Sequence, residues 1–96
     1  MNSSEKRYKL LLVDDEMSWS NNLKDELEKL SFEVCYEEKA ENTLKRIHDF
    51  KPDAVLLDIL FHQKNKGKPA FGQIKAKHLA LPVIMLTSTM VDTYVD

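Results

Sequence analysis

The sequence predicts a single α/β domain built on a doubly wound parallel sheet. Short apolar runs alternate along the chain with stretches of helical periodicity, in the order β-α-β-α-β-α-β. Strands that alternate with helices pair in parallel through right-handed crossovers, and the helices then cover both faces of the sheet. A chain of 96 residues is long enough for one domain. We therefore treat residues 1–96 as one unit and residues 1–7 as a flexible tail.

The first half of the chain supplies two strands and the helix between them. Residues 8–13 form the first strand, because an aliphatic run ends there at a polar turn. A helix of about residues 18–30 follows, with Ser18 as its N-cap. The apolar positions of that helix recur at helical spacing and are Trp19, Leu23, Leu27 and Leu30. Residues 32–36 form the second strand, in which Cys35 is predicted to be a buried thiol.

The middle of the chain supplies a second helix and a third strand. An amphipathic helix begins near Ala40 and ends at about Phe50, because Pro52 cannot continue it. Residues 53–58 form the third strand, whose interior 54–57 is a continuous apolar run. The polar stretch 62–68 is predicted to be a mobile loop.

The last section of the chain supplies a third helix and a fourth strand. Pro69 suits the first turn of a helix that covers about residues 70–78. The apolar residues 82–86 form the fourth strand. Residues 91–96 are either the start of a fourth helix or a disordered end.

Composition and charge exclude several classes of function. The net charge is −2, so no general field would hold the chain on nucleic acid or on an anionic membrane. The longest apolar runs have the length of strands, far below the roughly 20 residues of a membrane span. The polar N-terminus lacks the apolar core of a secretory signal. We therefore expect a cytoplasmic protein without a nucleic-acid or membrane partner.

Acidic residues follow two of the predicted strands. Asp14, Asp15 and Glu16 come directly after the first strand, and Asp58 ends the third. The carboxyl ends of parallel strands meet at one edge of the sheet, where ligands bind in open α/β folds. Like charges at such short range need a divalent cation, or some of them must take up protons. The acids after the first strand, taken alone, are equally well explained as a solvated turn before a helix.

A phosphoryl site is the chemistry that such a cluster favours. The carboxylate oxygens of Asp14, Asp15 and Asp58 would suit Mg²⁺ or Mn²⁺ as ligands. Mg²⁺ is usually held by one or two carboxylates together with a phosphate. A carboxylate beside the metal ion can act as a nucleophile and form an aspartyl phosphate. Asp58 is the best candidate, because it stands alone at its strand end. Thr87 follows the fourth strand, where its hydroxyl could bind a phosphoryl oxygen.

The chain resembles the receiver domain of two-component response regulators. The resemblance rests on three segments and covers about residues 8–90. The segments are LLVDDE at 11–16, KPDAVLLDI at 51–59 and LPVIMLTS at 81–88. It implies a flavodoxin-like sheet of order 2-1-3-4-5, of which this chain would hold only the first four strands, in the order 2-1-3-4. The fifth strand and the fifth helix would be absent.

The resemblance also implies roles for individual residues. Asp58 would accept a phosphoryl group from a phosphohistidine of a sensor histidine kinase or a phosphotransfer protein. Asp15 would bind Mg²⁺ directly, Asp14 would bind it partly through water, and the backbone carbonyl of Leu60 would complete the protein ligands. Thr87 would supply the hydroxyl that shifts toward the phosphoryl group. The chain would be a phosphoacceptor and not an enzyme, with slow autophosphatase activity the most that the resemblance allows.

The sequence departs from the family pattern near its end. It stops at Asp96, before the fifth strand, whose lysine pairs with the phosphoryl group in the family. The fourth strand would then be a sheet edge. Apolar surface would be left open beside Leu11, Val13, Val83 and Met85. The chain could be a fragment of a longer protein, a homodimer that pairs through the strand-four edge, or a naturally shortened receiver.

Two other functions remain open on the sequence. A pseudo-receiver would use the same fold as a protein–protein interaction module and would never carry phosphate. A metal-dependent phosphatase would use a similar sheet, but such enzymes often need a second acid two places after the nucleophile. Leu60 occupies that place after Asp58, which argues against a phosphatase.

Overall fold

The computed structural model describes residues 7–15, 17–58 and 67–86, and in these ranges four strands form one parallel sheet. The strands are β1 (Lys9–Val13), β2 (Glu33–Glu37), β3 (Ala54–Asp58) and β4 (Val83–Leu86). Their order across the sheet is β2-β1-β3-β4, and every pair of neighbours is parallel. The predicted doubly wound sheet of order 2-1-3-4 is therefore confirmed.

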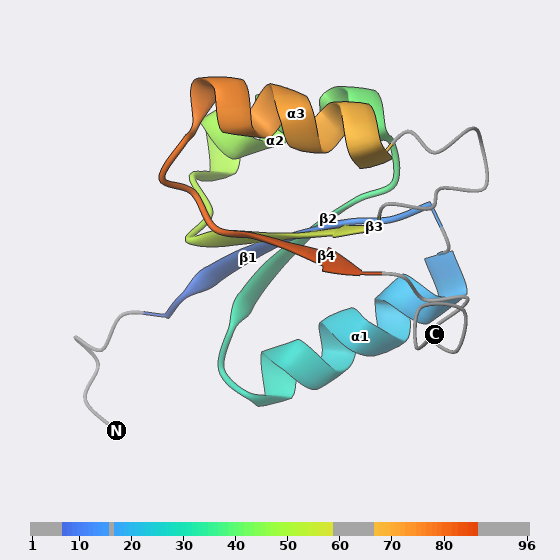
Figure 1. The fold of residues 1–96 in the computed structure, drawn as a ribbon. Helices are drawn as coiled ribbons and strands as arrows, with labels where there is room; N and C mark the ends of the chain where they lie inside the picture. The colour runs from blue at the N-terminus through green and yellow to red at the C-terminus, as the bar shows by residue number, and fades with distance from the viewer. Residues whose placement is uncertain (1–6, 16, 59–66, 87–96) are drawn as a thin grey trace, which may run out of the picture.

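The helices lie on both faces of this sheet (Figure 1). Helix α1 (Met17–Lys29) covers one face. The other face carries α2 (Thr43–Phe50), which is preceded by the short 3-10 helix η1 (Ala40–Asn42), and α3 (Gly67–Lys77). The sheet is thus the middle of three layers, as the alternation of strands and helices predicts.

Each face of the sheet has its own apolar core. The buried residues on the face of α2 and α3 are Leu11, Val13, Ala40, Ile47, Val55, Leu57, Ala70 and Ile74. Those on the face of α1 are Leu10, Leu12, Val34 and Leu56, against which Leu23 and Leu27 of the helix pack. Successive residues of a strand point to opposite faces. The central strands are therefore buried on both sides, which explains their continuous apolar runs.

Helix α1 ends in a Schellman motif. Ser31 adopts a left-handed conformation with φ of 74°, and its N–H donates to the carbonyl of Glu28 at 3.0 Å. The N–H of Phe32 donates to the carbonyl of Leu27 at 3.2 Å. These two bonds satisfy two of the carbonyls that the end of the helix leaves free. Leu30 falls within this turn and is 69% exposed, so the prediction that it belongs to the apolar face of the helix was wrong.

Other helix boundaries also differ from the prediction. Helix α1 begins at Met17, so Ser18 lies inside the helix and is not its N-cap. Helix α3 begins at Gly67, three residues earlier than expected, and Pro69 therefore lies in its first turn. Helix α2 ends at Phe50 as predicted. Cys35 is half-buried and not fully buried.

The expectation of open apolar surface is confirmed for Met85 of β4 but was wrong for Leu11 and Val13 of β1. Leu11 and Val13 have no exposed surface, because their side chains lie on the face that α2 and α3 cover. Ile84 of β4 is 50% exposed and Met85 is 40% exposed. Ile84 pairs in register with Leu56, which places it on the face of α1. Exposed apolar surface is therefore found on β4 and not on β1.

Some predictions concern residues outside the described ranges. The predicted N-terminal tail falls almost entirely on residues 1–6, and the predicted fourth helix or disordered end falls on residues 91–96. Most of the predicted loop at 62–68 also lies outside them. Within the described ranges, no helix is both long enough and apolar enough to cross a membrane.

Candidate functional site

The register of β1 against β3 brings the predicted acids together. Val13 pairs with Leu57, so the next residues along the two parallel strands, Asp14 and Asp58, lie side by side at the carboxyl edge. One carboxylate oxygen from each of Asp14, Asp15 and Asp58 lies within 4.8 Å of the others. The strand order reverses between β1 and β3, and ligands bind at such a switch point. The structure thus assembles the acid cluster that the sequence predicted.

The acid cluster is largely withdrawn from solvent. Asp14 is 1% exposed and Asp58 is 2% exposed, while Asp15 is half-buried. Two unit charges 4.8 Å apart repel by about 3 kcal/mol at the effective dielectric constant of a protein site. Burial weakens the screening by water and salt. A bound cation would lower this repulsion between the carboxylates.

The donor set fits a hard divalent cation. All three side chains offer carboxylate oxygens, which Mg²⁺ and Mn²⁺ prefer. Oxygens on opposite sides of an octahedral Mg²⁺ are about 4.2 Å apart. The observed spacing of up to 4.8 Å is close to this span and suits a mixture of direct and water-mediated contacts. Asp14, Asp15 and Asp58 are therefore the residues that could hold the ion.

Strand β2 anchors the backbone of Asp14 from the side. The N–H of Asp14 donates to the carbonyl of Glu37 at 3.0 Å. The hydroxyl of Tyr36 donates to the carbonyl of Asp14 at 2.6 Å. The main chain at the acid cluster is thus fixed by β2 as well as by β3. The contacts of Tyr36 and Glu37 with Asp14 were not predicted from the sequence.

Glu37 is the last residue of β2, and its buried carboxylate accepts several hydrogen bonds. Its side chain accepts hydrogen bonds from Nε of Arg46 at 2.7 Å, from the N–H of Lys39 at 2.8 Å and from Nδ2 of Asn42 at 3.3 Å. Burial alone would raise the pKa of Glu37, but these bonds outweigh burial and lower the pKa. The network ties the end of β2 to η1 and α2. A glutamate at the end of an apolar strand was the only signal of this network in the sequence.

The remaining predicted site residues lie outside the described ranges. They include Leu60, which was expected to offer its carbonyl to the metal ion, and Thr87, which was expected to bind a phosphoryl oxygen. The assembled portion of the site therefore consists of residues that follow β1 and end β3.

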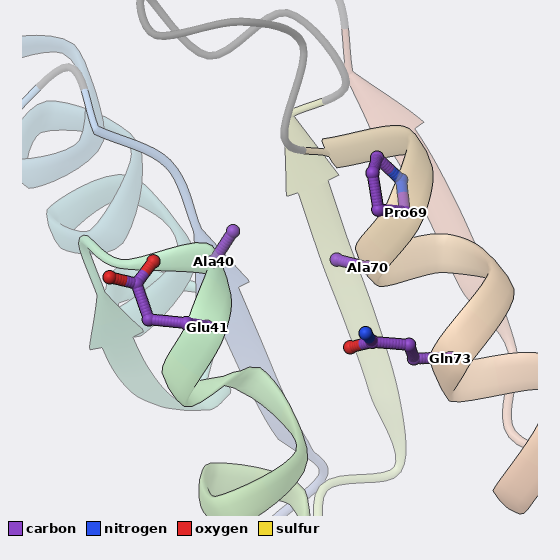
Figure 2. Close-up of a pocket in the computed structure, with 5 residues that line it drawn as sticks. All are labelled: Ala40, Glu41, Pro69, Ala70 and Gln73. Carbon is purple, nitrogen blue, oxygen red and sulfur yellow. The ribbon is translucent and has the colours of Figure 1, made fainter.

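A groove of about 390 Å³ lies between η1 and α3, on the face of the sheet opposite α1 (Figure 2). Its lining residues are Ala40, Glu41, Pro69, Ala70 and Gln73. Ala40 and Ala70 point toward each other across the groove. The groove is mainly apolar and shares no residue with the acid cluster. It is therefore a surface feature separate from the candidate cation site.

A doubly wound sheet with three carboxylates at its switch point defines an α/β protein with the donor set of a hard-cation site. The response regulator receiver domain family matches residues 10–96 of the chain. The chain therefore belongs to this family, and it is a receiver domain of the two-component response regulators. Receiver domains are phosphoacceptors and not classical enzymes.

Curated relatives support this assignment. The chemotaxis protein CheY of Listeria monocytogenes is 40% identical over 83 residues, which cover 83% of this chain and 67% of CheY. The alkaline phosphatase synthesis transcriptional regulatory protein PhoP of Bacillus subtilis is 34% identical over 80 residues, which cover 83% of this chain and 33% of PhoP. The chain thus spans about a third of PhoP and two thirds of CheY.

Solved structures agree in fold. The BeF3-activated N-terminal receiver domain of Klebsiella pneumoniae RstA matches with a TM-score of 0.78 and 27% identity, over 88% of this chain and 71% of that chain. The complex of the histidine kinase ThkA with the response regulator protein TrrA contains a chain that matches with a TM-score of 0.76 and 32% identity. This match covers 84% of the present chain and 69% of that chain.

Replacement of Glu37 by glutamine tests the network that holds the end of β2. We expect Glu37→Gln to lower the free energy of unfolding at pH 7 by about 1–3 kcal/mol, because it weakens charged hydrogen bonds to a buried acceptor. The pKa of Glu37 is lowered in the folded state. Its contribution is therefore present above the ordinary glutamate pKa of about 4.3 and is lost as the pH falls through the folded value.

Urea unfolding of the wild type and of Glu37→Gln between pH 7 and pH 3 measures this loss. The difference between the two proteins should shrink as the pH falls below about 4.3. Glu33→Gln, at an exposed position of the same strand, is the matched control and should change stability little. A difference that stays constant with pH would show that the Glu37 charge contributes nothing.

Proposed function

We propose that this chain accepts a phosphoryl group on Asp58 from a phosphohistidine, with Mg²⁺ bound at the acid cluster. The observation that carries the proposal is the convergence of three carboxylates within 4.8 Å at the switch point of the sheet. Membership of the receiver family supports the same assignment. Asp58 is the proposed nucleophile because it ends β3 alone, whereas Asp14 and Asp15 follow β1 as a pair.

The proposed transfer is a displacement at phosphorus. A carboxylate oxygen of Asp58 forms the new bond to phosphorus, and the bond from phosphorus to the histidine nitrogen breaks. The departing imidazole keeps the electron pair and takes up a proton from water. A bound Mg²⁺ would neutralise charge on the carboxylates and on the phosphoryl oxygens. The later fate of the product, slow hydrolysis of the aspartyl phosphate, belongs to the same proposal.

The other site residues have supporting roles in the proposal. Asp15 binds the ion directly and Asp14 binds it partly through water. The carbonyl of Leu60 completes the protein ligands, and the hydroxyl of Thr87 binds a phosphoryl oxygen. The burial of Asp14 and the half-burial of Asp15 support this division, because the more exposed carboxylate reaches an ion at the surface more easily.

The proposed partner is a sensor histidine kinase or a phosphotransfer protein. The complex of ThkA with TrrA is an example of a kinase bound to a response regulator, and receiver domains interact with histidine kinases. We place the chain in the cytoplasm, where kinases obtain ATP. Transfer to this chain would then couple a kinase to an output that recognises the phosphorylated state.

Asp58→Asn tests the assignment of the acceptor. We expect the wild-type chain to gain one phosphoryl group from acetyl phosphate in the presence of Mg²⁺, and we expect Asp58→Asn to gain none. The amide keeps the shape of the side chain but is not a nucleophile for this reaction. Intact-protein mass spectrometry measures the product. Asp25→Asn, an exposed position on α1, is the control and should be labelled like the wild type.

Two outcomes of this experiment would contradict the proposal. Equal labelling of the wild type and Asp58→Asn would show that the acceptor lies elsewhere. A folded wild-type chain that acetyl phosphate never labels, with Mg²⁺ present, would favour a pseudo-receiver that serves only as an interaction module.

We also propose that the edge of β4 pairs with a second copy of the chain. Among the described residues, β4 pairs only with β3, and its Ile84 and Met85 expose 50% and 40% of their surface. An open edge strand offers unpaired N–H and C=O groups to another strand. A two-fold axis beside β4 would join the same edge of both copies, as in most homodimers.

Native mass spectrometry of wild type and Ile84→Lys tests this pairing. We expect a dimer for the wild type and a monomer for Ile84→Lys, because a charged side chain on an edge strand opposes pairing. Leu79→Lys introduces the same charge at a position that is 81% exposed and outside the sheet, and it should leave the dimer intact. A folded wild type that is entirely monomeric would exclude the homodimer.

A further inference from the structure

We infer that Tyr36 is a positioning residue for the cation site, and that its hydroxyl sets the direction of the Asp14 and Asp15 carboxylates. The hydroxyl donates to the carbonyl oxygen of Asp14 at 2.6 Å. That carbonyl belongs to the peptide that joins Asp14 to Asp15. The inference rests on the proposed function, because it assigns a task to Tyr36 only if the acid cluster holds an ion.

The peptide between the two acids controls both side chains. A peptide unit is planar, so fixing its carbonyl fixes the plane of all its atoms. The orientation of this plane sets ψ of Asp14 and φ of Asp15, and thereby the directions in which the two side chains leave the main chain. One hydrogen bond to this carbonyl therefore restrains two of the three candidate ligands.

Among the residues that the structure describes, regular strand pairing ends before this peptide. The paired residues of β1 end at Val13, which lies beside Glu37 on one side and Leu57 on the other. Beyond Val13, the N–H of Asp14 is held by the carbonyl of Glu37 at 3.0 Å. The carbonyl of the same residue is held by the Tyr36 side chain. Glu37 thus binds the N–H of Asp14 through its backbone carbonyl. The neighbouring Tyr36 binds the carbonyl of Asp14 through its hydroxyl.

Tyr36 is itself held firmly enough to act as an anchor. Its backbone lies in β2 opposite Leu12. Its half-buried ring packs against the core on the face of α1. A tyrosine side chain has only two rotatable angles, so little freedom remains once the ring is packed. The hydroxyl therefore occupies a defined position relative to the end of β1.

The expected effect follows from the tolerance of metal sites. Ligands must be held within about 0.5 Å of their productive positions, and groups that orient them commonly change metal affinity by about 10–100-fold. Here the ligands also repel one another, because three carboxylates lie within 4.8 Å. Without the hydrogen bond from Tyr36, the peptide between Asp14 and Asp15 could change its orientation. The two carboxylates would then move away from Asp58, and the affinity for the metal ion would fall.

Manganese binding to the full chain tests the inference without any phosphoryl transfer. Mn²⁺ prefers the same oxygen ligands as Mg²⁺, and electron paramagnetic resonance measures the free ion directly. We expect Tyr36→Phe, which removes only the hydroxyl, to raise the Kd for Mn²⁺ about tenfold or more. Tyr8→Phe removes a hydroxyl from a side chain that is 58% exposed, and it is the matched control with an unchanged Kd.

The measurement separates positioning from a general loss of stability. It is made well below the unfolding temperature, where a destabilised but folded protein would keep its affinity for the ion. Tyr36→Leu also lacks the hydroxyl and should show a similar loss, so either variant suffices if the other does not fold. If both variants keep the wild-type Kd, the role of Tyr36 is wrong and the cation site itself is unaffected. A wild-type chain that binds no Mn²⁺ would overturn the cation site and the inference together.

Discussion

The register between β1 and β3 is the constraint on which the candidate site depends. Val13 lies beside Leu57, and this pairing brings Asp14 next to Asp58 one step later. A slip of one residue would move every side chain of the strand to the opposite face. Leu11 and Val13 would then leave the core under α2 and α3, where they have no exposed surface. Core packing therefore fixes the position of the acids.

The same packing holds three carboxylates close together although they repel one another. The buried side chains of Asp14 and Asp58 lie with Asp15 within 4.8 Å of one another, although like charges repel at this distance. Functional sites commonly retain such local cost because the surrounding structure enforces it. In the proposed function this repulsion raises the affinity for Mg²⁺, because the bound ion neutralises part of the negative charge.

The sequence predicted the strands and the acid cluster because both depend on short-range patterns. An apolar run that ends in an acid marks the carboxyl end of a strand, and parallel pairing brings such ends together. It did not predict which face Leu11 and Val13 occupy, since a strand buried on both sides has no polar alternation to mark its faces. It also missed Tyr36 and Glu37. Their contacts depend on the register of β2 and on how far side chains reach, which local sequence does not encode.

Thermal unfolding of the wild type and Asp58→Asn, each with and without Mg²⁺, tests the central claim most directly. Without the ion, loss of one charge should stabilise the variant by about 1–3 kcal/mol, which raises the unfolding temperature by at least about 4 °C for a domain of this size. Mg²⁺ should stabilise the wild type more than the variant, because only the wild type retains all three carboxylates. A variant that is no more stable without the ion and gains equally from Mg²⁺ would contradict the account.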